Sequence, residues 1–135
     1  MMDSEVLART ELKQFEDQTY MNLETYRKNG EGVKTPVWFV QDGDTIYVRT
    51  GEDSWKVKRL RGNPQAAIVP STSTGSPLGN WVAATAELVR DDAKEQEVNK
   101  LFDNKYGMQK RAFDLMGRVR GYKLATLAID LSGND

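Results

Sequence analysis

Apolar and polar residues alternate along short stretches of this chain, and turn-forming residues separate the stretches. In residues 81–89, one set of alternate positions is apolar (Val82, Ala84, Ala86 and Leu88) and the other is mixed. A period of two residues predicts a strand with one face on the core. Comparable runs predict five more strands, with the sequences TYMNLETY, VKTPVWFVQD, TIYVRTG, AAIVPS and YKLATLAIDL.

Two local signals indicate how the second and third of these strands are placed. Asp42-Gly43 separates them, and this dipeptide between apolar runs predicts a β-hairpin. Pro36 lies within the second strand and has no backbone N–H to donate to a neighbour. We therefore expect that strand to lie at an edge of the sheet or to carry a bulge there.

The pattern changes to a helical period in the segment SWKVKRLRGNP. Ser54 is a favourable N-cap, Val57 and Leu60 fall on one face, and Asn63-Pro64 ends the run. Three further helices are predicted over residues 4–18, 91–106 and 108–121, the last two separated by Gly107.

These elements predict a single α+β domain over residues 1–135, built on a six-stranded antiparallel β-barrel with short flanking helices. The composition is that of a globular domain, with 39% hydrophobic and 29% charged residues. No apolar run approaches the roughly 20 residues of a membrane span, and the N-terminus has no apolar secretory core. We therefore expect a cytoplasmic protein with no membrane partner.

The absence of two residue types limits the chemistry of the chain. It contains no Cys, which excludes thiolate nucleophiles, and no His, which excludes a Ser-His-Asp triad and the commonest metal ligand. We predict no metal site and assign no side chain a catalytic role. If the protein is an enzyme, a bound organic cofactor must supply the difficult step.

The segment 47–64, YVRTGEDSWKVKRLRGNP, holds a local excess of three positive charges in a chain whose net charge is −1. The predicted helix start offers free N–H groups and the positive end of a dipole. The hydroxyls of Thr50 and Ser54 and the ammonium groups of Lys56 and Lys58 would surround that position. This combination favours the binding of one phosphate group.

Two other interpretations of the same residues are open. The segment can be a solvated amphipathic helix, with Val57 and Leu60 inward and the cations in water. A small barrel can also bind single-stranded nucleic acid on aromatic side chains such as Trp38, Trp55 and Trp81. The net charge of −1 disfavours that role, and we predict no nucleic-acid partner.

Four motifs occur in an order that resembles the flavin and deazaflavin oxidoreductases of the split β-barrel fold, the superfamily that includes pyridoxamine-phosphate oxidase. They are a Pro-Val-Trp-Phe strand, a Tyr-Val-Arg-Thr strand, a Ser-x-Lys-Val-Lys-Arg helix and a Pro-Leu-Gly-x-Trp-Val strand start. The similarity runs from about residue 23 to residue 89, more weakly to the end, and is greatest to the F420-dependent branch. The C-terminus, AIDLSGND, lacks the Arg/His substrate motif of pyridoxamine-phosphate oxidases.

The resemblance implies a homodimer with cofactor sites at the subunit interface, and F420 or, alternatively, FMN as the cofactor. Carried over residue by residue, it implies that the ring lies along β-strand and loop residues and that the phosphate lies at the helix start. The implied ring contacts are Thr35, Pro36, Val37, Trp38 and Trp81, and the implied phosphate contacts are Thr50, Ser54, Lys56, Lys58 and the backbone at Val57.

Two functions follow from this resemblance. The first is an oxidoreductase in which the cofactor transfers a hydride to or from a small molecule, while the protein binds, orients and excludes water. The second is a non-catalytic cofactor carrier or sensor with the same fold. The phosphate site would be the same in both.

Overall fold

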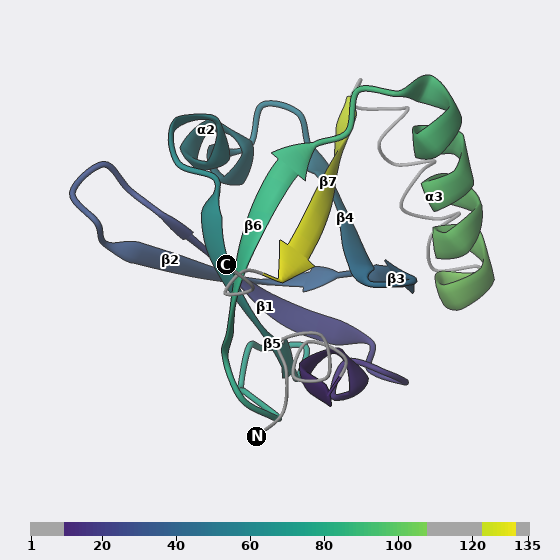
Figure 1. Ribbon diagram of the computed structural model, residues 1–135, viewed down its shortest axis with the longest axis horizontal. Coiled ribbons are helices and arrows are strands. Elements are labelled where there is room, and N and C mark those ends of the chain that lie inside the picture. Colours follow the sequence, from purple (N-terminus) through teal and green to yellow (C-terminus); the bar gives the residue numbers. More distant parts are fainter. Residues whose placement is uncertain (1–9, 108–122, 132–135) are drawn as a thin grey trace.

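The computed structural model describes residues 10–107 and 123–131, which form an antiparallel sheet flanked by helices (Figure 1). A short helical turn at residues 10–13 precedes the sheet. The strands are β1 (Tyr20–Tyr26), β2 (Gly32–Trp38), β3 (Val40–Asp42), β4 (Thr45–Gly51), β5 (Gln65–Ser71), β6 (Val82–Leu88) and β7 (Leu124–Leu131). The helices are α2 (Trp55–Gly62) and α3 (Asp92–Tyr106). The helix predicted over 108–121, and the first part of the one predicted over 4–18, lie outside the described residues.

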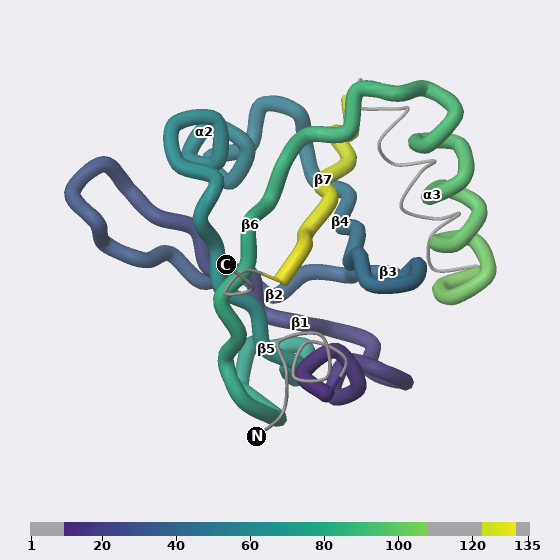
Figure 2. The backbone as a smooth tube through the Cα atoms, viewed as in Figure 1, coloured from purple at the N-terminus to yellow at the C-terminus, as the bar shows by residue number. Residues whose placement is uncertain are grey.

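The sheet has seven strands rather than the predicted six, in the order β2-β1-β5-β6-β7-β4-β3. The second predicted strand is divided at Phe39, because its first half pairs with β1 and its second half pairs with β4. The two halves are therefore the two edge strands of the sheet, although only one residue separates them in sequence. A sheet whose edges are joined so closely must curl, and Figure 2 shows the resulting half-barrel.

Local signals in the sequence account for the edge strand and the hairpin. Pro36 lies on β2, which is an edge strand, so its missing N–H costs no ladder bond there. Asp42 pairs with Thr45 across the β3–β4 turn, which leaves Gly43 as the first loop residue with φ +62°. Glycine adopts this left-handed conformation without steric cost. Both predictions are confirmed.

The hydrophobic core has two parts. The larger cluster fills the inside of the curled sheet and includes Phe15, Met21, Leu23 and Ile68, all fully buried. The second cluster lies between the outer face of the sheet and α3; its buried members are Val40, Tyr47, Val98, Phe102 and Tyr106. The alternation predicted along β6 is confirmed, since Val82, Ala84 and Ala86 are buried.

The last turn of α3 satisfies the backbone groups of Phe39, the residue at which β2 ends and β3 begins. The Tyr106 hydroxyl accepts a hydrogen bond from the Phe39 N–H at 2.9 Å. The same hydroxyl lies 2.8 Å from the carbonyl oxygens of both Phe39 and Thr19, between which it shares its proton. Lys105 Nζ also donates to the Phe39 carbonyl at 2.8 Å. We call this arrangement the Phe39 corner.

Within the part of the chain that the structure describes, no helix is both long and apolar enough to cross a membrane.

Candidate anion-binding site

The junction between β4 and α2 has the local geometry that the sequence predicts. Ser54 is the N-cap of α2 in an extended conformation, and its Oγ accepts a hydrogen bond from Val57 N at 3.4 Å. The Thr50 hydroxyl at the end of β4 lies 3.5 Å from the Ser54 hydroxyl. The N–H groups of Trp55 and Lys56 come before the first intrahelical hydrogen bond, which joins Lys58 N to Ser54 O. Two hydroxyls and two N–H donors therefore converge at one helix start.

Lys56 is a half-buried cation beside this helix start. Burial lowers the pKa of its ammonium group, and the positive charge of Arg59 lowers it further. Among the ion pairs of residues 10–107 and 123–131, none involves Lys56. A partly desolvated cation next to another cation is stabilised by an anion, so the electrostatics at the junction favour a negatively charged ligand.

The other predicted phosphate contacts have different surroundings. The Lys58 ammonium lies 4.6 Å from the centroid of the Trp55 ring, and that ring is 71% exposed. The Val57 side chain is fully buried in the core, and its N–H already donates to Ser54. Lys58 is therefore on the surface side of α2, whereas Val57 anchors the helix to the barrel.

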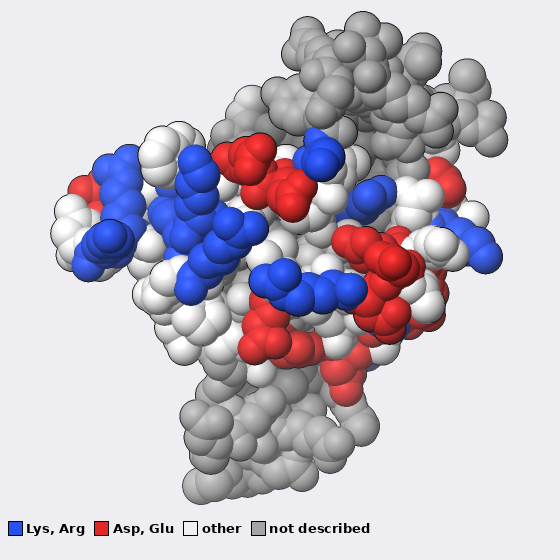
Figure 3. All heavy atoms as spheres, turned by 90° about the horizontal axis from the view of Figure 1, so that it is seen from above, with Lys and Arg blue, Asp and Glu red and all other residues white. Residues whose placement is uncertain are grey.

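Further basic residues extend from α2 to the β1–β2 hairpin. Arg59 Nε donates to the buried hydroxyl of Thr25 on β1 at 2.7 Å. Burial lowers the pKa of Arg59, and the positive charge of Arg27 lowers it further. Figure 3 shows Lys and Arg side chains gathered over α2 and the adjacent hairpin. We define the basic patch as the α2 cations Lys56, Lys58, Arg59 and Arg61 together with Arg27.

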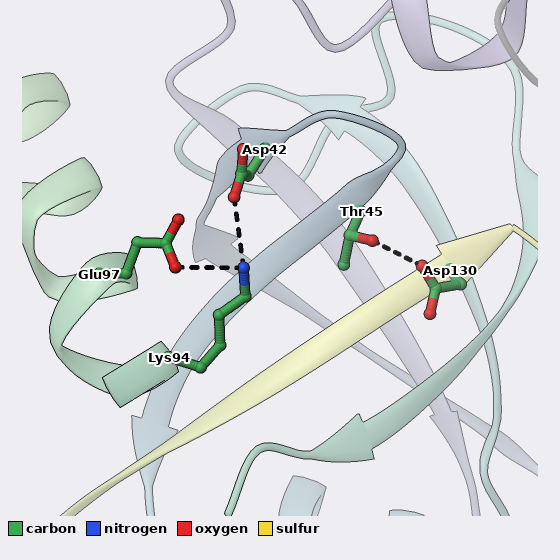
Figure 4. Close-up of polar contacts among 5 residues, drawn as sticks. All are labelled: Asp42, Thr45, Lys94, Glu97 and Asp130. Carbon is green, nitrogen blue, oxygen red and sulfur yellow. Dashed lines mark hydrogen bonds and ion pairs between the residues drawn. The ribbon is translucent and has the colours of Figure 1, made fainter. Parts of the chain in front are cut away.

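Arg49 carries the remaining positive charge of the basic sequence segment but does not belong to this patch. Its side chain donates to Asn99 on α3 at 2.7 Å, on the other face of β4. Lys94 on α3 also reaches the neighbouring hairpin, where its Nζ lies 3.5 Å from Asp42, and within α3 it lies 3.3 Å from Glu97 (Figure 4). The alternation of side chains along a strand thus places Arg49 away from the α2 site.

The residues predicted to contact a cofactor ring lie on and beside the edge strand β2. Pro36 is exposed, Thr35 is half-buried, and Val37 packs against the main core. Trp38 stacks on Tyr106, with ring centroids 4.4 Å apart and an interplanar angle of 10°. One face of the Trp38 ring is therefore covered by the protein itself.

The predicted ring contact Trp81 precedes β6. It is 38% exposed, and the ammonium of Lys34 on β2 lies 5.2 Å from the centroid of its ring. The structure thus brings Trp81 close to β2, although 46 residues separate it from Thr35 in sequence. β2 also contacts β4, the strand that carries Thr50 and ends at Gly51. The two strands are not adjacent in the sheet order, so the curl of the sheet, rather than strand pairing, brings the two predicted groups onto contacting strands.

Sequence reasoning missed three polar contacts around these elements. The Arg59–Thr25 hydrogen bond, the Arg49–Asn99 hydrogen bond and the Phe39 corner each join segments at least 34 residues apart. No local pattern in the sequence indicates such pairings. Within the described residues, no three acidic side chains converge in a way that could hold a metal ion.

The fold resembles that of several solved structures. The HutZ heme storage protein from Vibrio cholerae superposes with a TM-score of 0.68 at 17% identity, covering 93% of this chain and 91% of that chain. General Stress Protein 26 from Bacillus anthracis superposes with a TM-score of 0.61 at 15% identity, covering 93% of this chain and 88% of that chain. A protein described as an F420 reductase superposes with a TM-score of 0.55 at 16% identity, covering 90% of this chain and 92% of that chain.

None of the curated proteins matches this sequence. The family model described as pyridoxamine 5'-phosphate oxidase matches residues 8–129, which is most of the chain. This protein therefore belongs to the pyridoxamine 5'-phosphate oxidase family.

Proposed function

We propose that this protein is an oxidoreductase that binds a flavin-type cofactor through its phosphate at the start of α2. The observation that carries the proposal is the half-buried Lys56, which has no carboxylate partner in the described chain and follows the Ser54 N-cap by two residues. Membership of a family that typically binds FMN or related flavins supports the same assignment. The split-barrel fold is common to that family.

We favour the deazaflavin F420 over FMN as the cofactor. A single phosphate carries at most two negative charges, whereas the basic patch offers five cations, of which only Arg27 is paired with a carboxylate, that of Glu31, within the described residues. F420 bears an acidic tail beyond its phosphate, and Arg59 and Arg61 lie three and five residues after Lys56 along α2, where that tail would be neutralised. The structural similarity to a protein described as an F420 reductase is consistent with this choice. FMN is the alternative.

When bound, the cofactor would supply hydride transfer, and the residues of the chain would bind and orient it. Thr50, Ser54 and Lys56 would hold the phosphate, and β2 with Trp81 would form the wall along the ring. Trp38 is held in place by its stacking on Tyr106, so it would present a fixed edge rather than a mobile ring. The chain offers no His or Cys, and we assign it no proton-transferring group.

A second copy of the chain would complete the site. The described surface exposes four large apolar side chains that a partner would cover: Trp55, Leu78, Trp81 and Leu124. Trp55 and Trp81 flank the two halves of the proposed site, so a homodimer would exclude water from both. Sedimentation velocity of the purified protein tests this association directly.

Cofactor titration tests the proposal. FMN and F420 are each added to the purified protein, and binding is followed by the change in cofactor fluorescence. We expect one of them to bind at micromolar concentration or below. Lys56→Ala should weaken that binding by about 1.5–3 kcal/mol, the range for a hydrogen bond to a charged group. Lys100→Ala, on the exposed face of α3, is the matched control and should change nothing.

Two results would contradict the proposal. If neither cofactor binds, the chain is not a flavin-dependent oxidoreductase. If a cofactor binds but Lys56→Ala and Lys100→Ala have equal affinities, the phosphate lies elsewhere. A protein that binds the cofactor but does not oxidise or reduce it with any of a panel of electron donors and acceptors would instead be the carrier or sensor.

A further inference from the structure

Two buried polar side-chain atoms among residues 10–107 and 123–131 have no hydrogen-bond partner. They are Nε of Arg49 on β4 and Oγ1 of Thr126 on β7. Thr126 is fully buried and Arg49 is half-buried. A buried polar group without a partner costs free energy, so such groups in a native protein indicate an ion, a ligand or an ordered water at that position.

The register of the sheet places these two residues opposite one another. Arg49 pairs with Thr126 across β4 and β7, so their side chains leave the same face of the sheet. The next pair on that face is Tyr47 with Ala128, which belongs to the apolar cluster beneath α3. Arg49 itself donates to Asn99 on α3 at 2.7 Å. The two unpartnered atoms therefore lie at the interface between the sheet and α3.

The polar groups at this interface offer mainly hydrogen-bond donors. Nε of Arg49 can only donate, the Thr126 hydroxyl can donate its proton, and the Asn99 amide has N–H donors besides the oxygen that accepts from Arg49. The acidic residues closest to Asn99 along α3 are Glu95 and Asp103, one turn before it and one turn after it. Neither these nor any other carboxylate in the described ranges forms an ion pair with Arg49.

This combination of charge and donors favours an anion over a water molecule. Arginine remains charged throughout the physiological pH range, and moving its charge out of water costs free energy unless an opposite charge compensates for the lost hydration. A water molecule could accept the same hydrogen bonds, but it would leave the guanidinium charge unpaired. One negative charge matches Arg49, whereas a doubly charged anion would cost more to desolvate.

We propose that Arg49 and Thr126 bind a small monovalent anion, such as chloride, between the sheet and α3. The Arg49 Nε and the Thr126 hydroxyl donate to the ion, and the bond from Arg49 to Asn99 links it to the helix. The ion therefore stabilises the attachment of α3, whose last turn carries Tyr106 and the Phe39 corner. This site is separate from the basic patch on α2 and does not depend on the proposed cofactor.

Thermal unfolding of the purified protein in sodium chloride and in sodium gluconate, at equal concentration, tests the inference. Gluconate carries the same charge but is too large for a buried site. An anion that binds only the folded state raises the melting temperature. At about 0.2 M chloride and a Kd of about 20 mM, the wild-type protein should melt roughly 4 °C higher than in gluconate. Equal melting temperatures in the two salts would indicate a water molecule instead and would overturn the inference.

Thr126→Val separates this site from general effects of salt, because it removes the hydroxyl and keeps the shape of the side chain. In gluconate the variant should be at least as stable as the wild-type protein, since it no longer buries an unpartnered hydroxyl. Chloride should raise its melting temperature by less than half of the wild-type shift. A loss of stability in gluconate would show that the hydroxyl already has a partner, and the inference would be wrong.

Thr45→Val is the matched control on the same pair of strands. The Thr45 hydroxyl bonds to Asp130 at 2.8 Å near the surface (Figure 4), and its removal should leave the chloride shift unchanged. Equal chloride shifts in Thr45→Val and Thr126→Val would contradict the proposed site. Lys56→Ala, which weakens the α2 site, should also keep the full shift. If that variant lost the shift, the stabilising anion would lie at α2 and not at Arg49.

Diffraction from crystals that contain sodium bromide locates the ion directly, because bromide scatters anomalously. We expect an anomalous peak within hydrogen-bonding distance of Arg49 Nε and Thr126 Oγ1. Bromide bound only at the basic patch, or at no position near Arg49, would overturn the inference. Neither this result nor the chloride shift depends on whether FMN or F420 binds, so the inference and the proposed function can fail independently.

Discussion

Replacement of Tyr106 by Phe tests whether the end of α3 stabilises the Phe39 corner through hydrogen bonds. The Tyr106 ring is only 6% exposed and stacks on Trp38 and Phe102, contacts that a Phe ring can keep. The hydroxyl alone is lost. Because Phe39 lies between two strands, its N–H would then have no partner in a buried position, whereas its carbonyl would keep the bond from Lys105.

The expected loss of stability is about 2 kcal/mol. A typical buried hydrogen bond contributes about 1 kcal/mol net, and a buried donor left unpaired costs about 1–3 kcal/mol. The Thr19 carbonyl lies on an exposed residue, where water can replace the lost donor, so we add nothing for it. Equilibrium urea unfolding, followed by far-ultraviolet circular dichroism, measures the free energy of unfolding with the slope as a check on two-state behaviour.

Tyr26→Phe is the matched control for this substitution. The Tyr26 hydroxyl donates to Glu24 at 3.1 Å near the surface and, within the described residues, bonds to no backbone group. Its removal should change the free energy of unfolding by less than about 0.5 kcal/mol. If Tyr106→Phe were as mild as Tyr26→Phe, the Phe39 N–H would have another partner and our account of the corner would be wrong.

The pH dependence of Tyr106 provides a second measurement. Burial raises the pKa of Tyr106 above the ordinary value of about 10. The folded state therefore holds a proton that the unfolded state releases, so stability is unaffected below about pH 10 and falls as the pH rises above it. Tyr106→Phe should lack this loss. An identical decline in the wild-type protein and the variant would refute the assignment.

Three further predictions concern other parts of the fold. Burial lowers the folded-state pKa of Lys105 to about 8, below that of an unfolded lysine, so the free energy of unfolding should rise between about pH 8 and pH 10. Lys105→Met should flatten that rise, as measured by urea unfolding across this pH range. Gly43→Ala should lower the free energy of unfolding by about 1–2 kcal/mol because φ is +62°, and a loss below 0.5 kcal/mol would show that the turn rearranges. Gly79→Ala places a Cβ against the Gln14 carboxamide and should break the two hydrogen bonds between Gln14 and Asn80. In thermal unfolding, adding Gln14→Ala to Gly79→Ala should therefore lower the melting temperature little further. Additive losses of melting temperature would contradict this.

Local features of the sequence predicted most of the secondary structure. The Ser54 N-cap, the hairpin at Gly43 and the alternation along β6 each depend on residues within one turn or one strand, and all three are confirmed. Pro36 correctly indicated an edge strand, because a missing N–H is a property of the residue itself. The proximity of the Thr50 and Ser54 hydroxyls was predictable for the same reason, because they lie within five residues of one another; their role as phosphate contacts stays a prediction.

The tertiary structure alone decided where the predicted second strand divides and which groups satisfy the break. An uninterrupted apolar run gives no sign that its two halves pair with opposite edges of a curled sheet. The partners of Phe39 come from Tyr106, 67 residues away, and hydrogen bonds over such distances depend on how the chain closes rather than on local propensity. The same holds for Lys105, whose Nζ meets the Phe39 carbonyl and ring only when the barrel has formed. Sequence determined the helices and strands and the positive charge beside α2. Packing determined the surroundings of the Lys105 amine, because desolvation is a property of the folded state.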